Sequence, residues 1–388
     1  MLLVLADKSK PAGVLMPKVL RFDFTQVFVF FLWLLFVSAA PFAAAQSGST
    51  ASSPAKPDPQ LKLRPPPAPS DEKAPEGRMH LDVVVTDAAG NPLFGISRQD
   101  FQVFDNGHPQ NVVSFQGFDG AAGKPGSLLS VLLVIDTVNS GLTDVSAMRD
   151  DAETFLRQNG GHLIQPVTVL LFTDAGFEVV GHPSLDGNAL AQAVHTIKPT
   201  VHTIRSAAGG EASVERFQLS GKALGAIVAH EAPIPGRKLM IWMGPGWPLL
   251  PQQEITYDTR SHALNYQAIA ELTNQLREAR MVLCSAGGGS QFFVRDYLKP
   301  VKSERDANSD NLALQVLALH SGGRTLDHGN HSHSADLQNT CMKEAGPYYT
   351  LTFDPPRAEK PMEYHALTVG VAKPDLTVHT SAGYYAEP

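Results

Sequence analysis

The sequence predicts an α/β protein built around a doubly wound, mostly parallel sheet, and three observations lead to this prediction. Residues 128–136 form an almost unbroken apolar run of strand length that ends in Asp136, which is typical of a strand covered on both faces. From residue 127 onward, apolar runs alternate with segments of helical periodicity. The 388 residues are 43% hydrophobic and 18% charged, so the chain can bury a large core.

The central domain is expected over 126–346, with strands joined by crossover helices. Strands are predicted over 128–136, 166–173, 177–181, 237–243, 280–284 and 324–326. Helices are predicted over 144–158, 186–196, 213–230, 262–279, 311–320 and 334–344. In open sheets of this kind, sites form where the carboxyl ends of the strands meet the loops. Asp136 is therefore the first candidate for a functional residue.

The N-terminal segment, residues 1–46, has the pattern of a targeting sequence. Four basic residues precede an uncharged apolar stretch over 27–37, and small residues at 43–45 suit a signal peptidase. We expect a cleaved signal peptide and an exported protein, in the periplasm, on the cell surface or outside the cell. The alternative is an uncleaved membrane anchor formed by residues 27–45. Met16 would be a more typical start than Met1.

Three further regions complete the expected organisation. Residues 47–77 hold eight prolines and are expected to be an extended, disordered linker. Residues 78–120 contain short alternating runs separated by turns such as Asp105-Asn106-Gly107, which predict a small antiparallel β-unit that packs on a larger neighbour. Residues 347–388 are expected to add strands over 348–353, 364–371 and 376–385 that pack on the preceding domains.

Charge and cysteine content narrow the classes of partner. The formal net charge is −7, with no long Lys/Arg run after the N-terminus, which argues against nucleic acid as the main partner. Cys284 and Cys341 are the two cysteines, too few for a disulfide scaffold and not spaced as a zinc site. In an exported chain they could form one disulfide; two buried thiols are the alternative.

Three separated stretches, 81–115, 128–140 and 348–386, are similar to one family. The residues that carry the likeness are Leu81, Gly90, Asp100, Phe101, Asp105, Asn106, Gly107 and Phe115 in the first stretch, Asp136 and Ser140 in the second, and Tyr348, Pro356, Tyr364, His365, Gly383 and Tyr384 in the third. The pattern resembles the acidobacterial von Willebrand factor A-related proteins. This resemblance implies an exported protein with a von Willebrand A-type, Rossmann-like domain between the small β-unit and the C-terminal strands. It implies no particular biochemical activity.

The resemblance also implies a place for a metal. A-type domains usually bind protein partners through a metal-ion-dependent adhesion site whose first loop reads Asp-x-Ser-x-Ser. Here Asp136 and Ser140 match, but Val138 offers no oxygen and Gly244 stands where the family has a further aspartate. Thr203 or Ser213 could stand for the threonine of the second loop. Hard cations such as Mg²⁺ and Ca²⁺ need many oxygen ligands, so we expect no functional metal and instead a hydrogen-bonded cap by Asp136 and Ser140.

A Pro/Gly-stiffened loop over 244–248 is expected at the same sheet edge as Asp136. Trp247 and Pro245 in this loop, with Asn139 opposite, are candidate contacts for a partner, because a stiffened aromatic anchor loses little entropy on binding. The alternative is that Trp247 packs beneath its own loop as part of the core.

The functional expectation is an exported, non-enzymatic protein-binding module, adhesion-like or scaffold-like. Its contact surface would be the loops at the carboxyl edge of the sheet, without a functional metal. No nucleophile elbow, zinc-protease helix or phosphate loop occurs in the sequence. Two alternatives remain: metal-ion-dependent adhesion through Asp136 and Ser140, and an uncharacterised envelope hydrolase.

Overall fold

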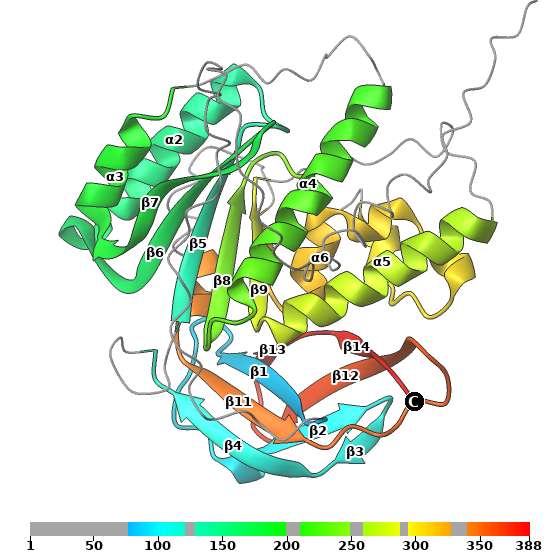
Figure 1. Ribbon diagram of the computed structural model, residues 1–388. Coiled ribbons are helices and arrows are strands. Elements are labelled where there is room, and N and C mark those ends of the chain that lie inside the picture. Colours follow the sequence, from blue (N-terminus) through cyan, green and yellow to red (C-terminus); the bar gives the residue numbers. More distant parts are fainter. Residues whose placement is uncertain (1–76, 121–128, 199–209, 249–258, 288–293, 327–339) are drawn as a thin grey trace, which may run out of the picture. The chain divides into compact units, whose positions relative to one another are not determined.

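The computed structural model describes the chain from residue 77 to its end, except for five internal gaps (Figure 1). The described ranges are 77–120, 129–198, 210–248, 259–287, 294–326 and 340–388. All of them belong to one structural unit. The expected targeting segment, the linker up to residue 76 and most of the helix expected over 334–344 lie outside the described residues. Within those residues, no helix is both long enough and apolar enough to span a membrane.

The central sheet has six strands in the order β10-β9-β8-β5-β6-β7. The strands are β5 (Leu129–Asp136), β6 (His162–Thr173), β7 (Gly176–Asp186), β8 (Arg237–Met243), β9 (Met281–Ala286) and β10 (Arg324–Leu326). All neighbours run parallel except β6 and β7, which form an antiparallel hairpin at the edge. The predicted doubly wound, mostly parallel sheet is confirmed.

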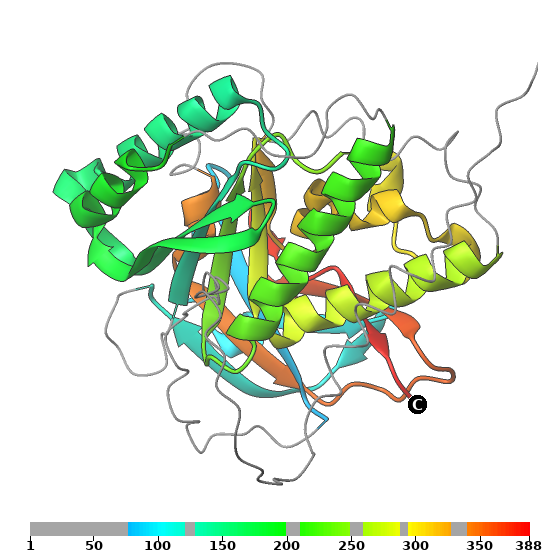
Figure 2. The ribbon, with the colours of Figure 1, turned by 45° about the horizontal axis from the view of Figure 1, so that its top comes forward.

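Helices cover both faces of this sheet (Figures 1 and 2). They are α2 (Leu142–Leu156) and α3 (Gly187–His195) on one face, and α4 (Gly210–Glu231), α5 (Thr259–Glu278) and α6 (Leu314–His320) on the other. Alternate residues of β5 explain this arrangement, because Leu133 and Ile135 pack with α2 and α3 whereas Leu132 and Val134 pack with α4 and α6. Burial on both faces is the reason that β5 is apolar along its whole length.

The terminal segments form two four-stranded sheets that share one core, with strand orders β13-β1-β11-β4 and β14-β12-β2-β3. The strands are β1 (Met79–Thr86), β2 (Phe101–Asp105), β3 (His108–Gln110), β4 (Val112–Phe118), β11 (Tyr348–Phe353), β12 (Glu363–Val371), β13 (Thr377–His379) and β14 (Gly383–Ala386). Each sheet mixes strands from before and after the central domain. The regions expected as a separate β-unit and separate C-terminal strands therefore complete one another.

The expected single strand over 376–385 is wrong in one respect, because the structure divides it into β13 and β14 in different sheets. The residues between them are held by other elements. The Thr380 hydroxyl donates to the carbonyl of Asp82 at 2.9 Å, and the Ala382 amide donates to the carbonyl of His320 at 3.0 Å. These contacts carry the chain from one sheet to the other.

Residues that carried the family resemblance meet in a buried network between the two ends of the chain. Asp105 accepts a hydrogen bond from the Tyr384 hydroxyl at 2.6 Å, and its other oxygen lies 2.7 Å from Nδ1 of His365. All three side chains are buried. Burial and the contact with Asp105 raise the pKa of Tyr384. Buried polar groups need partners, so these positions hold β2, β12 and β14 in register.

An ion pair and a disulfide are two of the links that join this β-structure to the central domain. Arg280, directly before β9, donates to Asp82 of β1 at 2.6 Å. Burial raises the pKa of Asp82, but the charge and hydrogen bond of Arg280 outweigh it and hold that pKa below its ordinary value. The second link is a disulfide between Cys284 of β9 and Cys341, with the two Cα atoms 5.8 Å apart. Cys341 opens a 3₁₀ helix, Cys341–Ala345, that leads into β11.

Candidate functional site

Asp136 lies where the direction of chain winding reverses. β5 is flanked by β8 on one side and β6 on the other, and Asp136 is its last residue. Loops that leave neighbouring strands in opposite directions create a crevice at this point of a doubly wound sheet. The predicted position of Asp136 at the carboxyl edge of the central strand is therefore observed.

The carboxylate of Asp136 is buried and accepts four hydrogen bonds. Oδ1 accepts from the backbone amides of Val138 and Asn139, both at 2.9 Å. Oδ2 accepts from the side-chain amide of Asn139 at 2.7 Å and from the indole Nε1 of Trp242 at 2.9 Å. Every donor is a neutral N–H group. Asp136 thus caps the turn that follows β5, as the sequence predicted.

The pKa of Asp136 reflects two opposing effects. Burial raises the pKa, because a charged carboxylate is poorly solvated away from water. The hydrogen bonds from Asn139, Trp242 and Val138 lower it but do not offset burial. The site therefore holds a carboxyl group in a place that disfavours negative charge.

Ser140 does not form the cap expected of it. Its side chain is 5% exposed, and its hydroxyl has no hydrogen-bond partner. The first turn of α2 is closed by Asp144, which accepts a hydrogen bond from the Gly141 amide at 3.2 Å. Ser140 is free of the backbone contact that a capping serine makes.

Val138 and Asn139 join the turn to the second face of the sheet. Val138 is fully buried in the cluster that contains Trp242 and Trp247. The side-chain amide of Asn139 also donates to the hydroxyl of Ser220 in α4 at 2.9 Å. An apolar residue is therefore required at position 138, in place of the hydroxyl that a metal-binding loop would carry.

Trp247 belongs to the core, which is the second of the two alternatives left open by the sequence. Its side chain is 4% exposed, and its ring packs at right angles on Trp242 and Phe217, with centroids 5.5 and 6.3 Å away. Pro245 in the same loop is exposed. The ring of Trp247 would reach a partner only if the loop opened, whereas Pro245 faces solvent already.

Two glycines allow this loop to approach the site closely. A Cβ atom at Gly244 would lie 2.9 Å from Cβ of Asp136, and non-bonded carbons do not approach so closely. Gly246 has φ +84° and lies against the side-chain amide of Gln315 in α6. Gly244 thus stands where the resembled family has a further aspartate, and the side chain of Asp136 occupies the adjacent space.

Several buried polar atoms at this edge lack a hydrogen-bond partner. They are Asn139 Oδ1, Ser140 Oγ, Trp247 Nε1, Ser285 Oγ and Gln315 Oε1. Ser285 pairs with Trp242 across β8 and β9, so its hydroxyl lies on the same face of the sheet as the indole. Buried polar atoms usually have partners, so this edge has unused hydrogen-bonding capacity.

The donor set suits a hard cation poorly. Asp136 uses both oxygens on protein N–H groups, Val138 and Gly244 contribute no side-chain oxygen, and Ser140 contributes one hydroxyl. Of the other candidates, Ser213 accepts from Arg216 at 3.4 Å, and Thr203 lies outside the described residues. In the described part of the chain, no group of three or more His, Cys, Asp or Glu side chains is arranged to hold a metal. Mg²⁺ keeps several waters and is anchored in proteins by one or two carboxylates, and the carboxylate of Asp136 already accepts four hydrogen bonds.

Trp242 was not among the residues predicted to form the site. It lies in the middle of an apolar strand and resembles ordinary core, yet among the described residues its indole is the donor to Asp136 that comes from another strand. Its pairing with Val134 places it on the same face as Asp136. A buried tryptophan needs an acceptor for its N–H group. The sequence therefore indicates that Trp242 has an acceptor, but it does not show which residue provides it.

Among known proteins, this chain is similar to solved structures but to no family model and no curated sequence. No protein-family model matches the chain, and no curated protein matches its sequence. The crystal structure of the SpRpn10 VWA domain matches with a TM-score of 0.27 and 11% identity, over 55% of this chain and 95% of that chain. The TFIIH p34 N-terminal domain matches with a TM-score of 0.24 and 13% identity, over 55% of this chain and 96% of that chain. Scores of this size support no inference about function.

The strand order itself defines the class. A parallel sheet with one antiparallel edge strand, helices on both faces and an aspartate ending the central strand makes this a von Willebrand A-like fold. The fold implied by the sequence resemblance is therefore present.

Proposed function

We propose that the chain is an exported protein-recognition module whose contact surface is the carboxyl edge of the central sheet. The observation that carries this proposal is the Asp136 turn, which Trp242, Asn139 and two backbone amides hold in one geometry. A surface that is ordered before contact loses less entropy on binding.

The exposed residues of this edge supply the contact itself. Leu142, at the start of α2 directly after the Asp136 turn, is 48% exposed. Pro245 is exposed on the loop after β8, and Asn139 in the Asp136 turn is partly exposed. An apolar side chain beside partly buried polar groups is typical of the centre of a protein interface. Trp247 acts beneath this surface as support for the loop.

The same proposal includes export of the protein and kinship with the acidobacterial von Willebrand factor A-related proteins. The targeting pattern of residues 1–46 supports export, and the disulfide between Cys284 and Cys341 suits an oxidising compartment. The motifs in the terminal β-strands support kinship with the acidobacterial von Willebrand factor A-related proteins. Residues 27–45 would tether the protein to a membrane if they are not cleaved.

A charge substitution at the edge tests the proposal. Leu142→Asp should abolish capture of partners from envelope and secreted-protein extracts, and an acidic residue at a helix N-terminus does not weaken the helix. Ile164→Asp is the matched control, because Ile164 is 63% exposed but lies near the start of β6, at the opposite end of the sheet. Equal capture by Leu142→Asp and wild type would contradict the proposal.

Metal-ion-dependent adhesion is the second candidate, and one observation favours it. The Ser140 hydroxyl is buried without a partner, four residues after Asp136, where the resemblance implies a ligand. A cation could recruit this hydroxyl only if Asp136 gave up at least one of its present donors.

A further inference from the structure

One face of the sheet β13-β1-β11-β4 lies against the central domain and carries two histidines. His80 of β1 shares this face with Asp82, which binds Arg280 of the central domain, because alternate residues of a strand point to the same side. His379 of β13 pairs with Val84 of β1 and therefore extends the same row. Both histidines are partly buried. Two side chains that can take up a proton thus lie inside the junction between this sheet and the central domain.

Two arginines, from the end of α5 and the turn after it, hold β1 on either side of His80. Arg280 donates to Asp82, two residues after His80, at 2.6 Å. Arg277 donates to the sulfur of the residue before His80 at 3.2 Å, and its own carboxylate partner, Glu278, is 64% exposed. His80 therefore has two arginines beside it and one carboxylate, Asp82, that already pairs with an arginine.

His379 lies beside a second cluster in which arginines outnumber carboxylates. Its charged neighbours are Glu344 and Arg324. Glu344 is fully buried and accepts hydrogen bonds from Arg324 at 2.8 Å and from Arg237 at 3.2 Å. Arg237 also lies over the ring of Tyr348 in the same sheet, with its Cζ 5.3 Å from the ring centroid. One carboxylate thus serves two arginines on this side of the junction.

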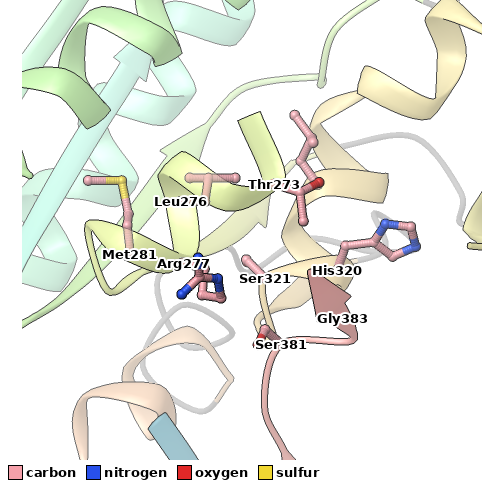
Figure 3. Close-up of a pocket in the computed structure, with 9 residues that line it drawn as sticks. Thr273, Leu276, Arg277, Met281, His320, Ser321, Ser381 and Gly383 are labelled. Atoms are coloured by element: carbon pink, nitrogen blue, oxygen red, sulfur yellow. The ribbon is translucent and has the colours of Figure 1, made fainter. Parts of the chain in front are cut away.

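The junction also contains a small unfilled space beside Arg277. This pocket lies between α5, the end of α6 and the segment that leads into β14. It has room for a group about the size of a water molecule or slightly larger. Figure 3 shows Arg277 and Ser381 at the pocket, with the ring of His320 turned away from them. The packing beside Arg277 is therefore not continuous.

The pKa values of His80 and His379 both lie below the ordinary value of 6.5. Burial is the largest cause for each histidine, and the neighbouring arginines lower the pKa further, whereas the neighbouring carboxylates raise it. Each histidine therefore binds a proton more readily when the junction is open. The free energy that holds the junction closed is fully present above pH 6.5 and falls as the pH drops below this value.

We propose that His80 and His379 make this junction an acid-sensitive latch, which holds the terminal sheets on the central domain while both rings are neutral and loosens when they are protonated. Protonation adds two positive charges where four arginines already meet two carboxylates. Like charges repel more strongly away from water. The latch is separate from the Asp136 edge and does not depend on the function proposed for that edge.

Hydrogen exchange of the full chain at about pH 7.5 and about pH 5.5 tests the latch. The amides of Ala382 and Tyr385 report on it, because they donate across the junction to the His320 carbonyl at 3.0 Å and to Asn274 Oδ1 at 3.1 Å. After correction for the intrinsic exchange rate, the opening equilibrium at these amides should rise as the pH falls, by at most about tenfold per pH unit for each histidine. The amides of β5 should keep their protection.

Neutral replacements identify the groups responsible. The double variant His80→Gln/His379→Gln should lose most of the rise, and Gln at position 80 can still reach the Thr352 hydroxyl, which lies 3.3 Å from Nδ1 of His80. His182→Gln, which changes an exposed histidine of β7, is the matched control and should keep the rise.

The wild-type measurement decides even if the double variant does not fold. Equal protection of Ala382 and Tyr385 at the two pH values would overturn the proposal. An increase in exchange that β5 shares would also overturn it, because the central domain would then unfold together with the junction. A rise of undiminished size in a folded double variant would have the same consequence.

Discussion

The indole Nε1 of Trp242 donates a hydrogen bond of 2.9 Å to Oδ2 of Asp136, although the two residues are 106 positions apart in the chain. The contact crosses from β8 to β5 at the carboxyl edge of the central sheet. It places a neutral N–H group beside the carboxylate that a cation would otherwise approach. The organisation of the candidate site depends on this pair.

The first prediction concerns the contribution of this hydrogen bond to stability. Trp242→Phe should lower the free energy of unfolding by about 1–3 kcal/mol more than Trp247→Phe does, because it leaves a buried carboxylate oxygen one donor short. Trp247→Phe is the matched control, since it makes the same change in the same cluster at an indole whose N–H has no partner. Urea unfolding of both variants measures the difference. Equal losses would mean that only ring packing matters.

A second prediction follows from Lys238, whose side chain is buried at the start of β8 and donates to the carbonyl of Ala279 at 2.9 Å. Burial lowers the pKa of Lys238 to about 8. Between this value and the unfolded pKa near 10.4, the unfolded chain binds more protons than the folded one. The free energy of unfolding should therefore rise with pH above about 8, by at most about 1.4 kcal/mol per pH unit.

Chemical unfolding from pH 7 to 10 measures this dependence. Lys238→Met should flatten the rise, and Met suits the apolar surroundings of the side chain. Lys222→Met, which changes an exposed lysine of α4, should leave the rise unchanged. If the free energy of unfolding of the wild type stays level or falls across this range, the titration of Lys238 does not control the pH dependence of stability.

A third prediction concerns the disulfide. Cys284 and Cys341 are separated by 57 positions, and closing a loop of that length stabilises a protein by about 4 kcal/mol in the chain-entropy description. The double variant Cys284→Ala/Cys341→Ala should lose stability of this order in urea. Mass spectrometry after alkylation without reductant should find neither cysteine alkylated in the wild type, because both sulfurs are in the disulfide. Two alkylated thiols in protein purified from an oxidising compartment would contradict the pairing.

The sequence was sufficient where local signals decide the structure. The strand β8 lies over 237–243 as predicted, because the apolar run 239–243 is bounded by Arg237 and Lys238 on one side and by Gly244 on the other. The β2–β3 hairpin forms at Asp105-Asn106-Gly107, with positive φ at Asn106 and Gly107, as an Asn-Gly turn requires. These elements depend on residues close together in the chain.

Features that depend on distant pairing could not be read in the same way. Trp242 reaches Asp136 only because β8 lies beside β5 in one register, and a shift by one residue would turn the indole to the opposite face. The two terminal sheets also depend on distant pairing, because each combines strands from before and after the central domain. Trp247 was predicted with two alternatives because exposure of a loop aromatic is decided by what lies beneath it, here Trp242 and Phe217.

We propose that N–H donors from Trp242 and Asn139 organise the Asp136 edge for protein recognition in place of a cation. Calorimetric titration of the wild-type chain with Mg²⁺, Mn²⁺ and Ca²⁺ tests this proposal, with Asp136→Ala as the comparison. We predict no saturable binding heat for any of the three ions in either protein. Saturable heat in the wild type that disappears in Asp136→Ala would contradict the proposal and establish metal-ion-dependent adhesion through Asp136 and Ser140 instead.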